Sequence, residues 1–197
     1  MLKRLCIYCG SSPGSLSDYA DAAHACGSAL ARHGHGLVYG GGNVGMMGML
    51  ADATLAAGGE VIGVIPHYLA DRELAHPGAT QMHRVNSMHE RKQMMADLSD
   101  GFIILPGGIG TLEELFENFT WLQLGLHAKP IGLLNVRGFF SPMLAFLDHM
   151  VTHRFLKQEH RDMLLVADDI ETLLVRMNSF AAPDAGKWLD TAREDLR

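Results

Sequence analysis

The chain has 197 residues, of which 48% are hydrophobic and 19% charged, a composition typical of a folded globular protein. Its formal net charge of −6 argues against nucleic acid as the main partner, since nucleic-acid-binding proteins usually carry a basic face. No apolar run approaches the roughly 18–20 residues of a membrane span. The first residues enter a strand-like run directly and lack a signal-peptide cleavage region. We therefore expect a cytoplasmic protein without a nucleic-acid or membrane partner.

Short apolar runs alternate with longer segments of helical periodicity. Strands are expected at residues 5–8, 36–39, 61–65, 81–85, 102–105, 131–134 and 164–166. Helices are expected at residues 16–33, 44–57, 87–98, 111–126, 141–152 and 170–177. Continuous apolar strands alternating with helices indicate a parallel sheet covered on both faces. The sequence thus predicts a doubly wound, Rossmann-like α/β fold, with one catalytic domain over 1–180 and a C-terminal tail over 181–197.

Ligands of such folds bind outside the carboxyl ends of the strands. Three glycine-rich loops are expected at that edge, at residues 10–12, 40–43 and 106–111. The second, continued to Gly45, matches G-x-G-x-x-G between a strand and a helix. A dinucleotide site also needs an acidic residue at the end of the next strand, but Glu60 precedes that strand. We expect backbone contact with a mononucleotide there, the alternative being a tight turn that serves packing.

The third loop, P-G-G-I-G-T at 106–111, is expected to begin a helix and to bind phosphate. Its glycines allow close backbone approach, and the free N–H groups and helix dipole favour an anion. The loop lacks a Walker lysine, which argues against a triphosphate with magnesium. Thr111 and Glu114 also have the spacing of a capping box. We favour a functional Glu114, because polar groups that converge at the ligand-binding edge are typical of a site.

A basic segment, M-H-E-R-K at 88–92, is expected near the start of another helix. The helix dipole disfavours cations there, so Arg91 and Lys92 suggest an anionic ligand nearby. The alternative is a solvated surface.

Together, M-H-E-R-K at 88–92 and P-G-G-I-G-T-L-E-E at 106–114 resemble the Lonely Guy (LOG) family of cytokinin riboside 5′-monophosphate phosphoribohydrolases, once mislabelled lysine decarboxylases. The similarity extends through Y-G-G-G at 39–42, V-I-P at 64–66, T-W-L-Q-L-G at 120–125 and K-P-I-G-L-L-N at 129–135. It implies hydrolysis of the N-glycosidic bond of an N6-modified adenosine 5′-monophosphate, without a cofactor. The products are the free base and ribose 5-phosphate.

The resemblance implies that Arg91 and Glu114 are catalytic. Glycosidic cleavage passes through an oxocarbenium-like state, which a carboxylate such as Glu114 stabilises. Many plant members have Tyr where this chain has Ile109, a difference that bears on base preference. The expected substrate-binding residues are Ser12, Gly41, Gly42, Glu73, Arg91, Lys92, Gly107, Gly108, Ile109, Gly110, Thr111, Leu112, Glu113, Glu114 and Thr120.

Three alternatives stay open beside this reading. The same loops suit a non-catalytic nucleotide or molybdenum-cofactor carrier, and equally a general purine nucleotide 5′-monophosphate nucleosidase. A pyridoxal-phosphate lysine decarboxylase needs a Schiff-base lysine and a much larger cofactor apparatus, and we identify neither in the sequence.

The helix expected at 111–126 is apolar on nearly all sides, which indicates burial within one subunit or a subunit interface. We expect a homodimer, as the family resemblance also implies. Cys6 and Cys9 form a C-x-x-C within a strand, where residues three apart point to opposite faces, so reduced thiols are expected. The histidines form no H-E-x-x-H or Cys/His cluster, and no metal site is expected.

Overall fold

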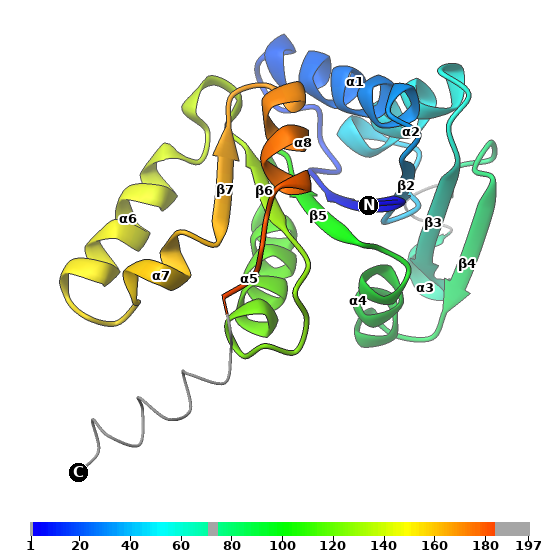
Figure 1. Ribbon diagram of the computed structural model, residues 1–197. Coiled ribbons are helices and arrows are strands. Elements are labelled where there is room, and N and C mark those ends of the chain that lie inside the picture. Colours follow the sequence, from blue (N-terminus) through cyan, green and yellow to red (C-terminus); the bar gives the residue numbers. More distant parts are fainter. Residues whose placement is uncertain (1, 71–74, 184–197) are drawn as a thin grey trace.

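The computed structural model describes residues 2–70 and 75–183 (Figure 1). Within these residues one parallel sheet has seven strands in the order β4-β3-β2-β1-β5-β6-β7. The strands are β1 (Arg4–Tyr8), β2 (Gly36–Tyr39), β3 (Val61–Pro66), β4 (Gln81–Val85), β5 (Gly101–Ile104), β6 (Ile131–Leu134) and β7 (Leu164–Ala167).

Helices cover both faces of this sheet (Figure 1). One face carries α1 (Ser17–Arg32), α2 (Gly45–Ala56) and α8 (Ile170–Asn178). The other carries α4 (Met88–Asp97), α5 (Ile109–Gln123) and α6 (Ser141–Thr152). Three short helices complete the described chain: α3 (His67–Ala70), η1 (Val136–Gly138) and α7 (Gln158–Arg161). The predicted doubly wound parallel fold is confirmed.

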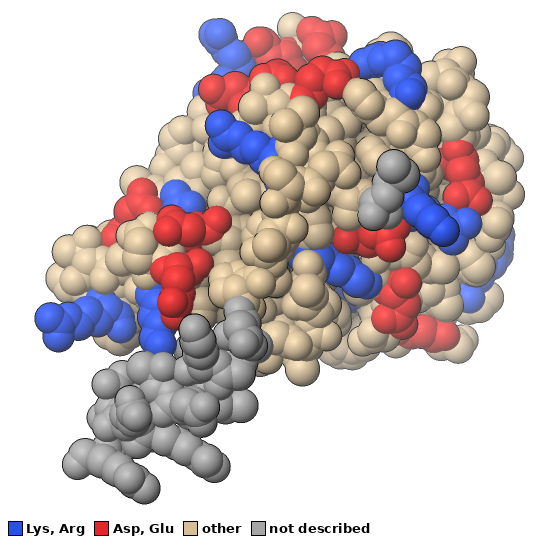
Figure 2. Space-filling view, in the orientation of Figure 1, with Lys and Arg blue, Asp and Glu red and all other residues tan. Residues whose placement is uncertain are grey.

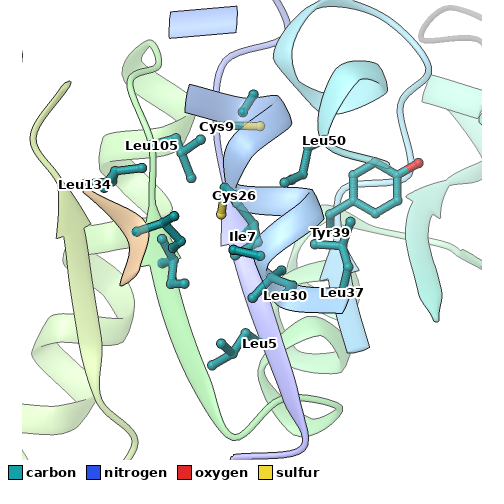
Figure 3. Close-up of a cluster of buried hydrophobic side chains, with 14 of the residues drawn as sticks. Leu5, Ile7, Cys9, Cys26, Leu30, Leu37, Tyr39, Leu50, Leu105 and Leu134 are labelled. Atoms are coloured by element: carbon teal, nitrogen blue, oxygen red, sulfur yellow. The ribbon is translucent and has the colours of Figure 1, made fainter. Parts of the chain in front are cut away.

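The core consists of two apolar clusters separated by the sheet, one of which is drawn in Figure 3. Side chains that alternate along a strand enter opposite clusters, as a pleated strand requires. Cys9 and Cys26 lie in one cluster and Cys6 in the other, and all three are free thiols. Burial raises the pKa of each, that of Cys26 to about 12, so these thiols are inert rather than redox-active.

The chain order of the strands reverses between β1 and β5. Strands β1 to β4 succeed one another in one direction, and β5 to β7 in the other. The loops after β1 and β5 therefore emerge side by side, and the Gly10 amide donates to the Pro106 carbonyl over 3.0 Å. Such a switch point opens a crevice at the carboxyl ends of the strands, where open α/β sheets bind ligands.

Most predicted elements match the observed ones to within two residues. The exception that matters is α5, which begins at Ile109 and ends at Gln123 rather than covering 111–126. The short helices α3, η1 and α7 were not predicted, because three or four residues are too few to show helical periodicity. Of the predicted tail, 181–183 are described and 184–197 lie outside the described residues. None of the described helices is both long and apolar enough to cross a membrane.

Candidate active site

A cavity of about 390 Å³ lies at the switch point. It is lined by residues from the ends of β1 and β2, from α2, α3 and α4, and from the start of α5: Ile7, Tyr8, Cys9, Gly10, Ser11, Gly40, Met47, Leu69, Met88, Arg91, Met95, Gly108, Ile109, Gly110, Thr111 and Glu114. Five of the predicted site residues from the glycine loop, 108–111 and Glu114, thus converge here with Arg91.

A larger hollow, of about 790 Å³, lies at the opposite, amino-terminal edge of the sheet. Three of the charged side chains that line it have partners within the protein: Arg4 donates to Glu60 over 2.8 Å, and Asp100 accepts the backbone N–H groups of Lys3 and Arg4. This ion pair gives Glu60 a structural role. Glu60 precedes β3, so it lies at the opposite edge of the sheet from the one where an acidic residue could bind a ribose. Because ligands of this fold bind at the other edge, we place the active site in the smaller cavity.

The start of α5 offers unpaired backbone donors to this cavity. Leu112 donates the first intrahelical bond, to the Gly108 carbonyl over 3.2 Å, so the N–H groups of residues 109–111 have no carbonyl within the helix. A Cβ placed on Gly108 or on Gly110 would meet no atom of the described residues within 4 Å. The two glycines therefore keep open the space through which an anion reaches the N–H groups and the positive end of the helix dipole.

Thr111 does not cap this helix. The N-cap is Gly108, in extended conformation, and Thr111 is the third helical residue, buried with its hydroxyl close to Gly107. The capping-box alternative for Thr111 and Glu114 is therefore wrong. A side-chain cap is found instead at α4, where the Ser87 hydroxyl accepts the Glu90 N–H over 3.1 Å.

Arg91 is buried, with only 6% of its surface exposed. Its Nε donates to the Val64 carbonyl over 3.0 Å, and its Nη2 to the Gly40 carbonyl over 2.7 Å. These bonds tie the guanidinium to β3 and to the residue that follows β2, while it lines the cavity. The alternative of a solvated surface is therefore wrong for Arg91. A buried cation at a helix start is costly unless it is hydrogen-bonded, and these two bonds meet that requirement.

Gly40 is required by this arrangement. A Cβ at residue 40 would lie 2.2 Å from the Arg91 Nη2, closer than atoms can approach. The first glycine of the G-x-G-x-x-G pattern thus allows the Arg91 guanidinium to approach the backbone closely, a role that a dinucleotide would have in a dinucleotide-binding protein.

Glu114 projects into the cavity from the second turn of α5. Burial raises the pKa of this carboxyl to about 7; the Glu113 and Glu117 carboxylates add to the rise, while the cations of Arg91 and Lys92 oppose it. A carboxyl that changes protonation state near neutral pH is suited to general acid–base chemistry.

Lys92 leaves the cavity and turns towards α5. Its ammonium donates to Glu113 Oε1 over 2.5 Å and to Glu117 Oε1 over 3.0 Å, and 7% of its side chain is exposed. The Lys92 contact with substrate that the family resemblance implies stays a prediction.

The described wall of the cavity does not include four other predicted residues, Ser12, Gly41, Gly42 and Gly107. Ser12 and Gly107 line an adjacent hollow of about 250 Å³, which shares Gly10, Ser11 and Gly108 with the cavity. Gly41 has a positive φ of 79°, and its carbonyl accepts the His76 N–H over 3.0 Å. Gly42 pairs with Ala75 in an isolated bridge.

Leu112 and Thr120 do not belong to the described wall of the cavity. Leu112 is half-buried, and Thr120 is exposed with its hydroxyl donating to the Phe116 carbonyl over 2.7 Å. Glu73 lies outside the described residues. The substrate contacts of these residues stay predictions.

The sequence reading missed Tyr8 and an apolar wall formed by Met47, Leu69, Met88 and Met95. Tyr8 ends β1, so the rule for the carboxyl ends of strands would have found it. The methionines carry no such signal, because their spacing equally fits core packing. In the part of the chain that the structure describes, no group of three or more His, Cys, Asp or Glu residues is arranged to hold a metal ion.

Comparison with known proteins identifies the family. The cytokinin riboside 5′-monophosphate phosphoribohydrolase LOG of Oryza sativa is 45% identical over 178 residues, which cover 90% of this chain and 74% of the rice protein. The cytokinin riboside 5′-monophosphate phosphoribohydrolase of Rhodococcoides fascians is 45% identical over 90% of each chain. The chain belongs to the LOG family. A family model described as "Possible lysine decarboxylase" matches residues 47–177 of this LOG-family chain.

Solved structures similar to this LOG-family member include the molybdenum cofactor binding protein of Rippkaea orientalis, at 19% identity and a TM-score of 0.66, with 91% of this chain and 97% of that chain covered. The molybdenum cofactor carrier protein of Chlamydomonas reinhardtii has 19% identity and a TM-score of 0.67, with 90% and 97% covered. At such identities the likeness concerns the fold alone.

Proposed function

We propose that this protein hydrolyses the N-glycosidic bond of N6-modified adenosine 5′-monophosphates, releasing the free base and ribose 5-phosphate. The observation that carries the proposal is the convergence in one cavity of Glu114, with a pKa of about 7, buried Arg91 and the open N-terminus of α5. The names of relatives about 45% identical over 90% of the chain support the same reaction.

In the proposed mechanism, the N–H groups at the start of α5 bind the 5′-phosphate of the substrate. That contact positions the ribose beside Glu114, about one helical turn further along. The Glu114 carboxylate stabilises the positive charge that develops on the sugar ring as the N-glycosidic bond breaks, and it removes a proton from the attacking water. The base leaves with the electron pair of that bond and takes up one proton, while the hydroxyl of the water joins the sugar. Arg91, held by two backbone carbonyls, orients Glu114 or the nucleotide.

The apolar wall supports a base with an apolar N6 substituent. Met47, Leu69, Met88 and Met95 bring flexible apolar side chains to the cavity, and Ile109 stands at it with 82% of its surface exposed. A general purine nucleotide 5′-monophosphate nucleosidase has no need of such a wall. We therefore favour the N6-modified substrate over plain AMP.

The test is release of ribose 5-phosphate from a panel of nucleoside 5′-monophosphates. We expect Glu114→Gln to bind the nucleotide and to lose at least ~100-fold in turnover, the usual scale of acid–base catalysis. Arg91→Ala is expected to be nearly inactive. Release at the wild-type rate by Glu114→Gln would overturn the assignment of the base, and a wild type that binds nucleotides without cleaving them would favour a carrier.

The observed site favours an enzyme over a carrier and over a lysine decarboxylase. A carrier needs the phosphate contacts but not a buried carboxyl with a raised pKa beside them. A pyridoxal-phosphate enzyme needs a lysine that forms a Schiff base, whereas the Lys92 ammonium is held by two carboxylates of α5. Purified protein without absorbance at the aldimine band would agree with this choice.

We further propose a cytoplasmic homodimer whose catalytic domain comprises residues 1–180. The second half of α5 and the turn after it expose Phe116, Leu124 and Leu126, at 37%, 49% and 69%. Figure 2 has few charges in its lower middle, over α5 in Figure 1. An exposed apolar strip on a helix in a monomer of this size is typical of a subunit interface.

A further inference from the structure

Behind the cavity, three charged side chains join α4 to α5. We call them the α4–α5 charge cluster: Lys92, Glu113 and Glu117. The Lys92 ammonium is shared by both carboxylates, at 2.5 and 3.0 Å, and is almost wholly buried. With two carboxylates and one ammonium, the cluster has a net charge of −1 and is not a neutral ion pair.

Glu117 is the member that points to a role beyond linking two helices. Its Oε1 binds Lys92, but its Oε2 is buried and has no hydrogen-bond partner among the described residues. A carboxylate oxygen left without a partner destabilises the protein, and an ion pair selected for stability alone would not retain it. Glu117 follows Glu114 by three residues, so the two carboxyls are neighbours on one side of α5.

We propose that the α4–α5 charge cluster sets the charge state of Glu114, with Lys92 acting as a positioning residue through Glu114 rather than by contact with substrate. The inference rests on the proposed function. It also assigns Glu117 a role, although no motif of the sequence marked that residue.

The electrostatic environment of Glu114 supports the inference. The titratable and charged groups that face Glu114 within the described residues are Arg91 and Lys92 from α4, Glu113 and Glu117 from α5, Tyr8 and Cys6 from β1, and Cys9 in the loop after β1. Burial lowers the pKa of Lys92, but its bonds to both cluster carboxylates raise it overall, so the ammonium stays charged. Lys92 lowers the pKa of Glu114, and the cluster carboxylates raise it.

The signs of these effects give a test that a structural role cannot mimic. Lys92→Met removes the cation and raises the pKa of Glu114, while Glu117→Gln removes a carboxylate and lowers it. We expect the acid limb of the kcat–pH profile to move upward in Lys92→Met and downward in Glu117→Gln, each by about 0.5–1 pH unit for one partly screened charge at this range. In the double variant the opposing changes compensate, and the limb returns towards the wild-type position.

The matched control is Glu113→Gln, since Glu113 binds the same ammonium but has a side chain 52% exposed. The Glu113 carboxylate also raises the pKa of Glu114, so Glu113→Gln should move the acid limb downward as Glu117→Gln does. A cluster that only fastens α4 to α5 would lower the melting temperature in all these variants and leave the limb unmoved. If Lys92 touched the substrate phosphate, Lys92→Met would raise KM without moving the limb. Either result overturns the proposal.

A second readout separates this inference from the proposed function. The carboxyl ¹³C resonance of Glu114, assigned by its loss in Glu114→Gln, reports the titration directly and requires no turnover. If the wild type released no ribose 5-phosphate but the resonance titrated in opposite directions in the two variants, the reaction would be wrong and the cluster assignment right. Glu117→Gln is nearly isosteric, so a folded Glu117→Gln without a downward shift contradicts the inference even if Lys92→Met fails to fold.

Discussion

Glu114→Gln is expected to stabilise the protein at alkaline pH while removing its activity. The carboxyl has a pKa of about 7 in the folded protein against an ordinary value of 4.5, with burial as the main cause. A folded-state pKa above the unfolded value means that the folded protein binds the proton more tightly. Its stabilising contribution is therefore complete below pH 4.5 and is lost as the pH rises through about 7. Glutamine cannot ionise, so the Glu114→Gln variant does not lose stability in this way as the pH rises.

The magnitude follows from the same two pKa values. At 1.36 kcal/mol per pH unit, the raised pKa costs about 3 kcal/mol of stability at pH 8.5 but only about 1 kcal/mol at pH 5.5. The advantage of Glu114→Gln over the wild type should thus grow by about 2 kcal/mol between these pH values. For a chain of this length, that is about 4–8 °C in melting temperature.

The assay is thermal unfolding by circular dichroism at pH 5.5 and 8.5, at one protein concentration because a dimer would make the midpoint concentration-dependent. The control is Asp21→Asn, which removes a carboxylate exposed on the surface of α1 and should give the same small difference at both pH values. An advantage of Glu114→Gln that is equal at the two pH values, or larger at pH 5.5, would refute the buried, proton-binding carboxyl on which the mechanism depends.

Three further predictions concern the glycines and the dimer. Gly110→Ala should raise the melting temperature by up to about 4 °C, because alanine favours the helix by up to ~1 kcal/mol. It should also raise KM at least ~10-fold, because the new methyl group fills the space proposed for the phosphate. An unchanged KM would place the phosphate elsewhere. Gly40→Ala should lower kcat as far as Arg91→Ala does, because the new methyl displaces the guanidinium, and steady-state kinetics showing normal turnover would contradict that contact. Phe116→Glu with Leu124→Glu should convert a dimer to a monomer by light scattering, and a wild type already at monomer mass over micromolar concentrations would refute the interface.

The fold could be predicted from the sequence because each strand is a short apolar run and most of the helices are long enough to show a period. The edge that holds the site followed from the rule for parallel sheets. The partners of Arg91 could not be predicted, because Gly40 and Val64 contribute only their carbonyls and no side-chain pattern records a carbonyl. The sequence also could not predict that Arg91 faces the cavity while Lys92 turns towards α5. Adjacent residues diverge by ~100° around a helix, and the packing of the helix decides which of them faces the cavity.

The start of α5 illustrates how one glycine motif meets two different physical demands. A Cβ on Gly107 would lie 2.2 Å from the Thr111 hydroxyl, so this glycine is required by the packing of the protein itself. In the part of the chain that the structure describes, no atom comes close enough to Gly108 or Gly110 to exclude a methyl group, so a bound ligand is what would exclude it. Alanine at 107 should therefore impair folding, whereas alanine at 110 should impair binding alone. The predicted phosphate loop thus contains one glycine required for packing, Gly107, and two that face the ligand, Gly108 and Gly110. Only substitutions of Gly108 and Gly110 test the proposed function.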